Sequence, residues 1–394
     1  MEKVQTVSSL LQTHLRQILE ANYELGNVHE IYEIFGGYIN RSFGINCKIK
    51  DNNAQSNRFF LRKYKKGISE KEILFEHSLI EYSIANGFTC SAAVVNRKHG
   101  GTIVKVVAAC DEEIDYYALY HYLDGEDKYP WDNPVLNSEE CASAGEVLAL
   151  FHRSTQDFNP QGLERTEAKI MDLLSTRSAV FKKFAASACS ISISSKFHHY
   201  FLKKLEGILD VIERTILPAD VWQQMPQIPC HNDYHPGNLK FKDNQVVGVF
   251  DFDWSKIDLR LFDLCLAIVY CCCSWDDRQD GELLLDKCEI FLKTYQDTLS
   301  RADRSLLLTP EEKRNFSTLM AAANLYLINW DVCAYYNGTN LNEYEYLSYL
   351  QHNVRLMEWI ELNKRQLDQL IMAHLPGTSG ICGICDTCGT GQSL

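Results

Sequence analysis

The sequence predicts an α+β protein of two lobes, a small antiparallel β-sheet lobe followed by a larger, mainly helical lobe. Three observations support this prediction: β-favouring runs alternate with turns early in the chain, apolar residues recur at helical spacing later, and 394 residues can form two hydrophobic cores. We expect a first lobe over residues 1–123, a linker over residues 124–137, a second lobe over residues 138–375 and a flexible, Cys-containing tail over residues 376–394.

The strands and the one helix expected in the first lobe follow from its composition. Ile31 to Ile49 predicts a strand, a Gly-containing turn and a second strand, and Arg58 to Tyr64 predicts a third. The runs GTIVKVV and YYALYHYL predict two more strands. After the third strand, SEKEILFEHSLIEYSIANG predicts a helix, because Ser69 and Glu72 form a capping-box pattern and Gly87 can end the helix.

The second lobe begins where the pattern changes to helical spacing. Ser138 starts a predicted amphipathic helix, whose apolar face carries Cys141, Ala144, Val147, Leu148 and Phe151. The run QVVGVFDFDW predicts a short buried strand that ends in acidic residues. Residues 342–370 have a helical pattern over most of their length.

Composition excludes several classes of function. The net charge is 39 − 52 = −13, which argues against a nucleic-acid-binding surface. The longest apolar run, Leu264 to Cys273, is about half of the roughly 20 residues that a membrane-spanning helix requires. No apolar signal segment follows Met1, and we expect a cytoplasmic protein without a membrane partner. The oligomeric state stays open.

Fifteen Cys residues without a secretory context are expected to be mostly reduced thiols. Cys271 to Cys273 lie in an apolar run, so we interpret them as small buried side chains. Cys382, Cys385 and Cys388 have C-x2-C-x2-C spacing, which is compatible with opportunistic metal binding or redox-sensitive thiols. A fourth nearby Cys is missing, and we favour an inert tail.

The run PCHNDYHPGNLKF, Pro229 to Phe241, concentrates polar side chains between two strand-like segments, so we expect a loop. Asn238 on this loop and Asp251 after the next strand carry hard oxygen atoms, which Mg²⁺ binds together with water and phosphate. Asp233, two residues after His231, can accept a proton from an attacking hydroxyl group. Phosphoryl transfer requires positioning and charge neutralisation, so the pattern favours that reaction.

The loop HNDYHPGN and the run VVGVFDFDWSKIDLRLFDLCLA resemble motifs of the aminoglycoside phosphotransferase and choline kinase family, which includes homoserine kinase-like members. The resemblance covers about Ile31 to Ala267 and implies a protein-kinase-like fold that uses ATP and Mg²⁺. It implies that Asp233 is the catalytic base and that Asn238 and Asp251 hold the Mg²⁺.

The same resemblance implies supporting roles for residues near these positions. Asp253 is expected either to assist Asp251 or to face solvent. Asp258 and Asp263 are expected to anchor the catalytic loop, and His152 is expected to be structural. His231 is expected to shape the loop.

The first lobe resembles the nucleotide-binding lobe of the family. Gly36 and Gly37 would permit close approach of the backbone to phosphates. Arg62 occupies the position of the phosphate-binding cation, and we favour it over Lys63 because strand alternation places only one of the two on the cleft face. The resemblance also implies roles for Glu76, which would pair with that cation, and for the hinge residues Tyr120, Tyr122 and Leu123, which would contact adenine.

The acceptors of the family carry a hydroxyl group, as in homoserine, choline-like amino alcohols and aminosugars. Negative charge in the second lobe predicts a preference for amine-bearing alcohols over neutral or anionic ones. The candidate acceptor-binding residues are His235, Asp253 and Asp331, with Asn329, Trp330 and Tyr335 near the last of these. The carboxylate of homoserine would need a cation, and Arg260 or Arg278 could supply it.

Two other functions remain open from the sequence, a non-catalytic nucleotide-binding regulator and a kinase of protein side chains. The intact pattern of base and metal ligands argues against a regulator. An activation segment ending in Ala-Pro-Glu is not recognisable after Asp251, which argues against a protein acceptor.

Overall fold

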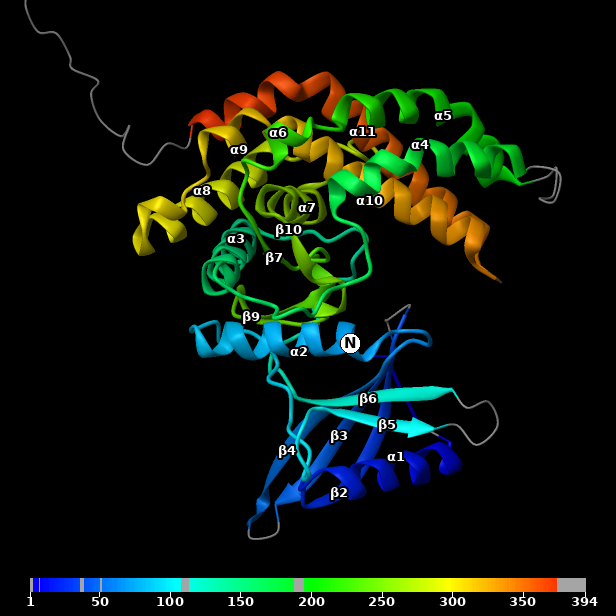
Figure 1. Cartoon of the computed structure of the whole chain (residues 1–394), viewed down its shortest axis with the longest axis vertical. Helices are drawn as coiled ribbons and strands as arrows, with labels where there is room; N and C mark the ends of the chain where they lie inside the picture. Colours follow the sequence, from blue (N-terminus) through cyan, green and yellow to red (C-terminus); the bar gives the residue numbers. More distant parts are fainter. Residues whose placement is uncertain are drawn as a thin grey trace, which may run out of the picture.

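The computed structural model describes residues 3–6, 8–35, 39–49, 52–107, 113–187, 195–339 and 341–373. A β-sheet lies at one end of the molecule and a group of helices at the other, with α2 (Glu70–Ala85) between them (Figure 1). The predicted two-lobed α+β architecture is therefore confirmed.

Six strands form the antiparallel sheet of the first lobe, in the order β1-β2-β3-β4-β6-β5. The strands are β1 (Lys3–Thr6), β2 (Asn27–Phe35), β3 (Arg41–Ile49), β4 (Asn52–Lys63), β5 (Ile103–Val107) and β6 (Ile114–His121). In the central strand β4, Arg62 pairs with Ser42 of β3 and with Ala118 of β6. This register fixes the face from which the Arg62 side chain leaves the sheet.

The first lobe contains a second helix, α1 (Ser9–Asn22), so the prediction of a single helix there is wrong. α1 buries Leu15, Ile18 and Leu19 in a small core shared with the sheet. Leu15 and the adjacent pair Ile18 and Leu19 are one turn apart and lie on one face of the helix, which packs against the sheet.

The helix α2 begins as predicted, with a capping box at Ser69 and Glu72. The backbone N–H of Ser69 donates to Glu72 at 3.0 Å, and the Ser69 hydroxyl accepts from the Glu72 backbone N–H at 3.3 Å. Glu72 also accepts a hydrogen bond from the Thr166 hydroxyl at 2.8 Å, which links the start of α2 to the second lobe. The capping box thus fixes the helix on which Glu76 is carried.

The second lobe is built of helices around two small antiparallel sheets. Its helices are α3 (Ser138–Thr155), α4 (Ile170–Ala186), α5 (Lys196–Thr215), α6 (Ala219–Trp222), α7 (Arg260–Cys272), α8 (Leu285–Ala302), α9 (Pro310–Arg314), α10 (Phe316–Asn337) and α11 (Glu343–Ala373). The two sheets pair β7 (Gln227–Cys230) with β10 (Lys256–Leu259) and β8 (Leu239–Lys242) with β9 (Gln245–Val249). In Figure 1, β9 lies beside α2, at the junction of the lobes.

The large core of the second lobe confirms several predictions. α3 starts at Ser138, and its predicted apolar face is buried. Cys271 to Cys273 are buried, as expected for small apolar side chains. The predicted tail, with Cys382, Cys385 and Cys388, falls outside the described residues. No helix within the described ranges combines the length and the apolar character needed to cross a membrane.

We expect Ser69→Ala to lower the free energy of unfolding by about 1 kcal/mol, because it removes the side chain that caps α2. Urea denaturation followed by circular dichroism would measure this change. Ser175→Ala, at an exposed position of α4, is the matched control and should change stability by less than about 0.5 kcal/mol. Equal stability of the two variants would contradict a stabilising role for the cap.

Candidate active site

A cavity of about 680 Å³ lies between the lobes. Eleven of the predicted site residues line it: Arg62, Glu76, Tyr120, Tyr122, Leu123, Asp233, His235, Asn238, Asp251, Asp253 and Asp331. Gly36 and Gly37 lie outside the described residues, so their role stays a prediction.

Asp263 on α7 anchors the start of the predicted catalytic loop, as expected. The fully buried carboxylate accepts the backbone N–H groups of His231 and Asn232 at 2.8 and 2.7 Å. Its third partner is Nε2 of His152, at 2.9 Å, which confirms that His152 is structural. These bonds hold Asn232 in a left-handed conformation with φ of 60°, which Asn tolerates better than most residues.

His231 connects the loop to the strand end that carries Asp251. Its Nε2 donates to the backbone oxygen of Phe250 at 3.1 Å, and its Nδ1 accepts from the backbone N–H of Asp233 at 3.3 Å. Burial lowers the pKa of His231, which favours the neutral ring that these two bonds require. The predicted loop-shaping role is confirmed.

Asp258 has a different partner from the one predicted. Its carboxylate accepts the backbone N–H of Ile170 at 2.9 Å and so holds the start of α4. Its other partners within the described residues are the backbone N–H of Leu259 and the ammonium group of Lys256, and neither belongs to the catalytic loop. The prediction that Asp258 anchors this loop is therefore wrong. The side chain of Asp258 leaves β10 towards α4, not towards the catalytic loop that follows β7.

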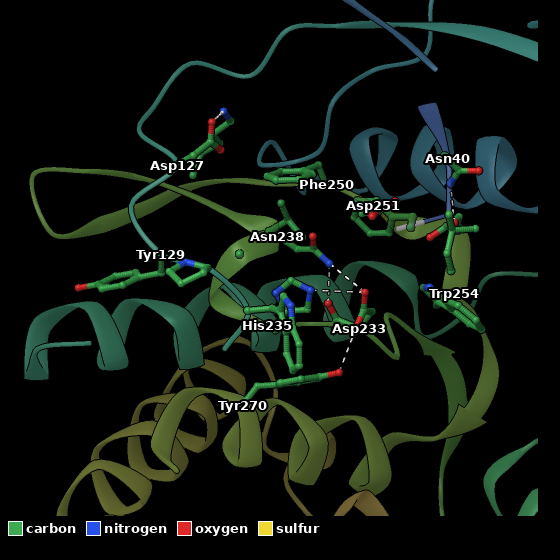
Figure 2. Close-up of a pocket in the computed structure, with 18 of the residues that line it drawn as sticks. Asn40, Asp127, Tyr129, Asp233, His235, Asn238, Phe250, Asp251, Trp254 and Tyr270 are labelled. Carbon is green, nitrogen blue, oxygen red and sulfur yellow. Dashed lines mark hydrogen bonds and ion pairs between the residues drawn. The ribbon is translucent and has the colours of Figure 1, made fainter. Parts of the chain in front are cut away.

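The carboxylate of Asp233 is held by three side chains at the floor of the cavity (Figure 2). Oδ2 accepts from Nδ2 of Asn238 at 3.1 Å and lies 3.6 Å from Nε2 of His235. Oδ1 accepts from the Tyr270 hydroxyl at 3.2 Å. Burial alone would raise the pKa of Asp233, but His235, His231 and Tyr270 outweigh it and lower the pKa, which favours the carboxylate.

Tyr270 was not predicted from the sequence. It lies on α7, seven residues after Asp263, and this spacing returns to nearly the same face of a helix. Once Asp263 is known to support the loop, this periodicity is the signal that could have found Tyr270.

The side-chain orientation of Asn238 follows from its partners. The amide nitrogen donates to both the backbone oxygen and the carboxylate of Asp233, and only an N–H group can make these two bonds. The amide oxygen is therefore directed away from Asp233. Asp251, with a side chain 29% exposed, lines the same cavity from a left-handed position with φ of 66°.

Arg62 joins the two lobes through its guanidinium. It donates to Glu76 of α2 at 3.1 Å and to Asp251 of the second lobe at 2.8 Å. Lys63 points to the other face of β4 and pairs with Asp115, so strand alternation selects Arg62, as predicted. Burial would lower the pKa of Arg62, but Asp251 and Glu76 raise it and keep the guanidinium charged.

Asp253 does not face solvent, because only 3% of its surface is exposed. It accepts from the Asn40 side chain at 2.7 Å and lines the same cavity as Asp251. Burial and the nearby charge of Asp251 raise the pKa of Asp253 to about 7. Asn40, which was not predicted from the sequence, thus contacts Asp253 and lines the cavity.

The residues proposed for the acceptor divide into two groups. Trp330 and Asp331 line the cavity, whereas Asn329 and Tyr335 do not. Asn329 accepts from Arg177 at 3.0 Å on another face of α10, and Tyr335, one turn beyond Asp331, bonds Ser195 at 2.9 Å. We name the part of the cavity lined by Trp131, Trp275, Trp330, Asp331 and Asn353 the acceptor end.

The cations proposed for a homoserine carboxylate are wrong. Arg260 is buried in an ion pair with Glu312 and does not line the cavity. Arg278 lies in an exposed turn and does not line it either. Both residues follow Asp251 and Asp253 in the sequence, but this position did not indicate the direction of their side chains.

Comparison with known proteins agrees with this geometry. The profile of the phosphotransferase enzyme family matches residues 33–302. The chain belongs to this family. It is therefore a phosphotransferase, and a hydroxyl group of a small molecule is its acceptor.

A curated relative and two solved structures show how far this likeness extends. The homoserine kinase of Afipia carboxidovorans is 25% identical over 277 residues, 70% of this chain and 72% of the relative. A microcompartment-associated aminopropanol kinase is similar in structure, with a TM-score of 0.58 at 15% identity over 92% of this chain and 99% of the other. A spectinomycin phosphotransferase in complex with ADP and spectinomycin has a TM-score of 0.56 at 13% identity, over 89% and 98% of the two chains.

We expect Asp263→Ala to lower the free energy of unfolding of the phosphotransferase by about 3 kcal/mol, because two buried backbone N–H groups lose their acceptor. Urea denaturation would measure the loss. Asp297→Ala, on the exposed surface of α8, is the control and should be nearly neutral. A loss below about 0.5 kcal/mol in Asp263→Ala would contradict the anchoring role.

Proposed function

We propose that this phosphotransferase moves the γ-phosphoryl group of ATP to the hydroxyl group of a small amino alcohol, with Mg²⁺ as cofactor. One observation carries the proposal: Asp233, Asn238 and Asp251 line one cavity between the lobes. The homologous homoserine kinase and the ADP complex of a structural neighbour support the choice of acceptor and nucleotide.

Asp233 is proposed as the base that receives the proton of the acceptor hydroxyl. Its lowered pKa keeps the carboxylate ionised at neutral pH, and its three side-chain partners fix its orientation. An ionised, oriented carboxylate can bind the hydroxyl hydrogen and direct the oxygen towards the phosphorus atom.

The oxygen atoms of Asn238 and Asp251 fit Mg²⁺. Both are hard donors, and the Asn238 amide nitrogen is already engaged, which leaves its oxygen for a ligand. Among the described residues, no group of three or more His, Cys, Asp or Glu side chains could hold a metal. Two protein ligands suit a Mg²⁺ that completes its shell with water and phosphate, where it would neutralise phosphate charge.

Nucleotide binding is assigned to the first lobe, which we propose to extend over residues 1–123. Arg62, held by Glu76, would contact phosphate oxygens, and the backbone from Tyr120 to Leu123 would contact adenine. Gly36 and Gly37 would cover the phosphates. Residues 124–137 would link this lobe to the acceptor-binding lobe.

The other two candidate functions are less well supported. A non-catalytic regulator does not require the base and both metal ligands together in one cavity. A kinase of protein side chains needs room for a polypeptide, whereas the chain after Asp251 passes through one short strand directly into α7 at Arg260. Three Trp side chains line the acceptor end of a cavity of about 680 Å³, which favours a small molecule.

The first test of the proposal removes the base. Asp233→Asn should reduce turnover by about 100-fold or more while ATP binding stays nearly intact, because the amide cannot accept the proton. Coupled detection of ADP and isothermal titration with ATP would measure the two properties. Asp220→Asn, exposed on α6, is the control. Turnover close to that of the unmodified enzyme would exclude Asp233 as the base.

The second test concerns the metal. Asn238→Ala and Asp251→Ala should both raise the Mg²⁺ concentration needed for half-maximal activity, and Asp251→Ala should do so more because it removes a full charge. Activity is measured over a Mg²⁺ titration, with the exposed loop variant Asn159→Ala as the control. Unchanged titrations in both cavity variants would contradict the metal assignment.

A further inference from the structure

Asp331 is a buried carboxyl at the acceptor end, and within the described part of the chain it has no cation partner. It lies on α10 and is 1% exposed, and it accepts a hydrogen bond from Nδ2 of Asn353 at 2.8 Å. Asp251 and Asp127, two other carboxylates of the cavity, are paired with Arg62 and Lys240. Among the described residues no cation pairs with Asp331, and burial raises its pKa well above its ordinary value.

Asn353 adds a second acceptor at the same place. It lies on α11 and is 3% exposed, and its Oδ1 is buried without a hydrogen-bond partner in the described structure. Its Nδ2 is engaged by Asp331, so the free atom of the amide can only accept a hydrogen bond. A carboxyl group without a cation partner and, beside it, an amide oxygen without a hydrogen-bond partner among the described residues can together accept N–H bonds from a cationic ligand, whose charge would favour the carboxylate form of Asp331.

Aromatic rings line the same end of the cavity as this pair of acceptors. The Trp131 ring lies 5.9 Å from the Trp330 ring and 6.3 Å from the Trp275 ring, and it packs on Tyr349 at 4.5 Å. All three Trp residues line the cavity. Aromatic faces stabilise a cation and limit the size of the group that carries it.

Tyr270 contacts the proposed base and lines the same cavity as the residues of the acceptor end. Figure 2 shows Tyr270 directed at Asp233, to which its hydroxyl donates at 3.2 Å. Tyr270, Asp233 and Asp331 line the same cavity. A bound acceptor could therefore present its hydroxyl group to Asp233 and its amine to Asp331.

The cavity does not provide a matching site for a carboxylate. Its Lys and Arg residues are all paired: Arg62 with Glu76 and Asp251, Lys128 with Glu140, and Lys240 with Asp127. His352 is bonded to Asp280, and burial lowers its pKa to about 4, which leaves it neutral at neutral pH. Within the described part of the chain, the acceptor end therefore offers no unpaired cation.

We propose that Asp331 and Asn353 bind the ammonium group of the acceptor, and that this acceptor is a short amino alcohol that keeps N–H bonds on its amine and carries no carboxylate. The proposal rests on the proposed function and narrows it. It predicts that this chain prefers a different acceptor from its homoserine kinase relatives, since homoserine carries a carboxylate beside its amine.

Four matched alcohols test the chemistry of the site on the unmodified enzyme. They are 3-aminopropan-1-ol, its N-trimethyl derivative, butan-1-ol as a neutral analogue, and homoserine, which is 3-aminopropan-1-ol with an added carboxylate. We expect kcat/KM for 3-aminopropan-1-ol to exceed that of each of the others by about tenfold or more, a difference that one well-placed interaction supplies. Equal or better use of butan-1-ol, the trimethyl compound or homoserine would overturn the proposal.

Two variants test the residues. Asp331→Asn should raise KM for 3-aminopropan-1-ol by roughly 30-fold or more, the effect of removing one partner of a buried charge pair. It should change kcat less, and it should leave KM for ATP and the turnover of butan-1-ol unchanged. Asn353→Ala should act in the same direction. The controls are Asp297→Asn on α8 and Asn363→Ala on α11.

The outcomes distinguish this proposal from the proposed function. An unchanged KM for the amine in folded Asp331→Asn would overturn the ammonium site and leave the phosphotransferase activity standing. Failure of the enzyme to phosphorylate any alcohol, with ATP bound, would remove both. Should Asp331→Asn fail to fold, the comparison of the four alcohols on the unmodified enzyme still decides the question.

Discussion

The buried guanidinium of Arg62 is the interaction on which the geometry of the site depends. It lies between two carboxylates from different lobes, Glu76 on α2 and Asp251 beyond β9. Without the guanidinium, the buried carboxylate of Glu76 would lose its cation and lie close to a second acid, which is costly. The three groups therefore hold one another, and the pairing sets the position of the first lobe relative to the proposed metal ligand.

The rest of the site consists of polar groups that are oriented before any substrate binds. Asp263 fixes the start of the catalytic loop, and Asn238 fixes the carboxylate of Asp233. The acceptor end is built differently, because its polar atoms at Asp331 and Asn353 are incompletely paired and lie among aromatic rings. We therefore assign the reaction itself to residues that are already oriented, and selection of the acceptor to residues that need a ligand to complete their hydrogen bonds.

Sequence reasoning predicted the parts of the site that lie close together in the chain. The proposed base and metal ligands could be predicted because they lie within short runs of the sequence, from His231 to Asn238 and directly after β9. Strand alternation distinguished Arg62 from Lys63. The capping box of α2 could be predicted for the same reason, because its two residues are only three positions apart.

Contacts between distant helices could not be predicted in this way. Tyr270, Asn40 and Asn353 gain their significance from packing, and helical spacing alone did not show that Asn329 and Tyr335 leave the cavity. α1 was not counted among the elements of the first lobe, because only its packing against the sheet shows that it belongs there. The cations proposed for a carboxylate failed for the same reason, since Arg260 is engaged in the core of the second lobe.

The most direct test of the account is a phosphorus NMR measurement of the complete reaction. The enzyme is mixed with ATP, Mg²⁺ and 3-aminopropan-1-ol, and the products are followed over time. The account predicts that ADP and a phosphate monoester of the alcohol appear in equal amounts. Formation of ADP with inorganic phosphate alone, or no consumption of ATP, would contradict it.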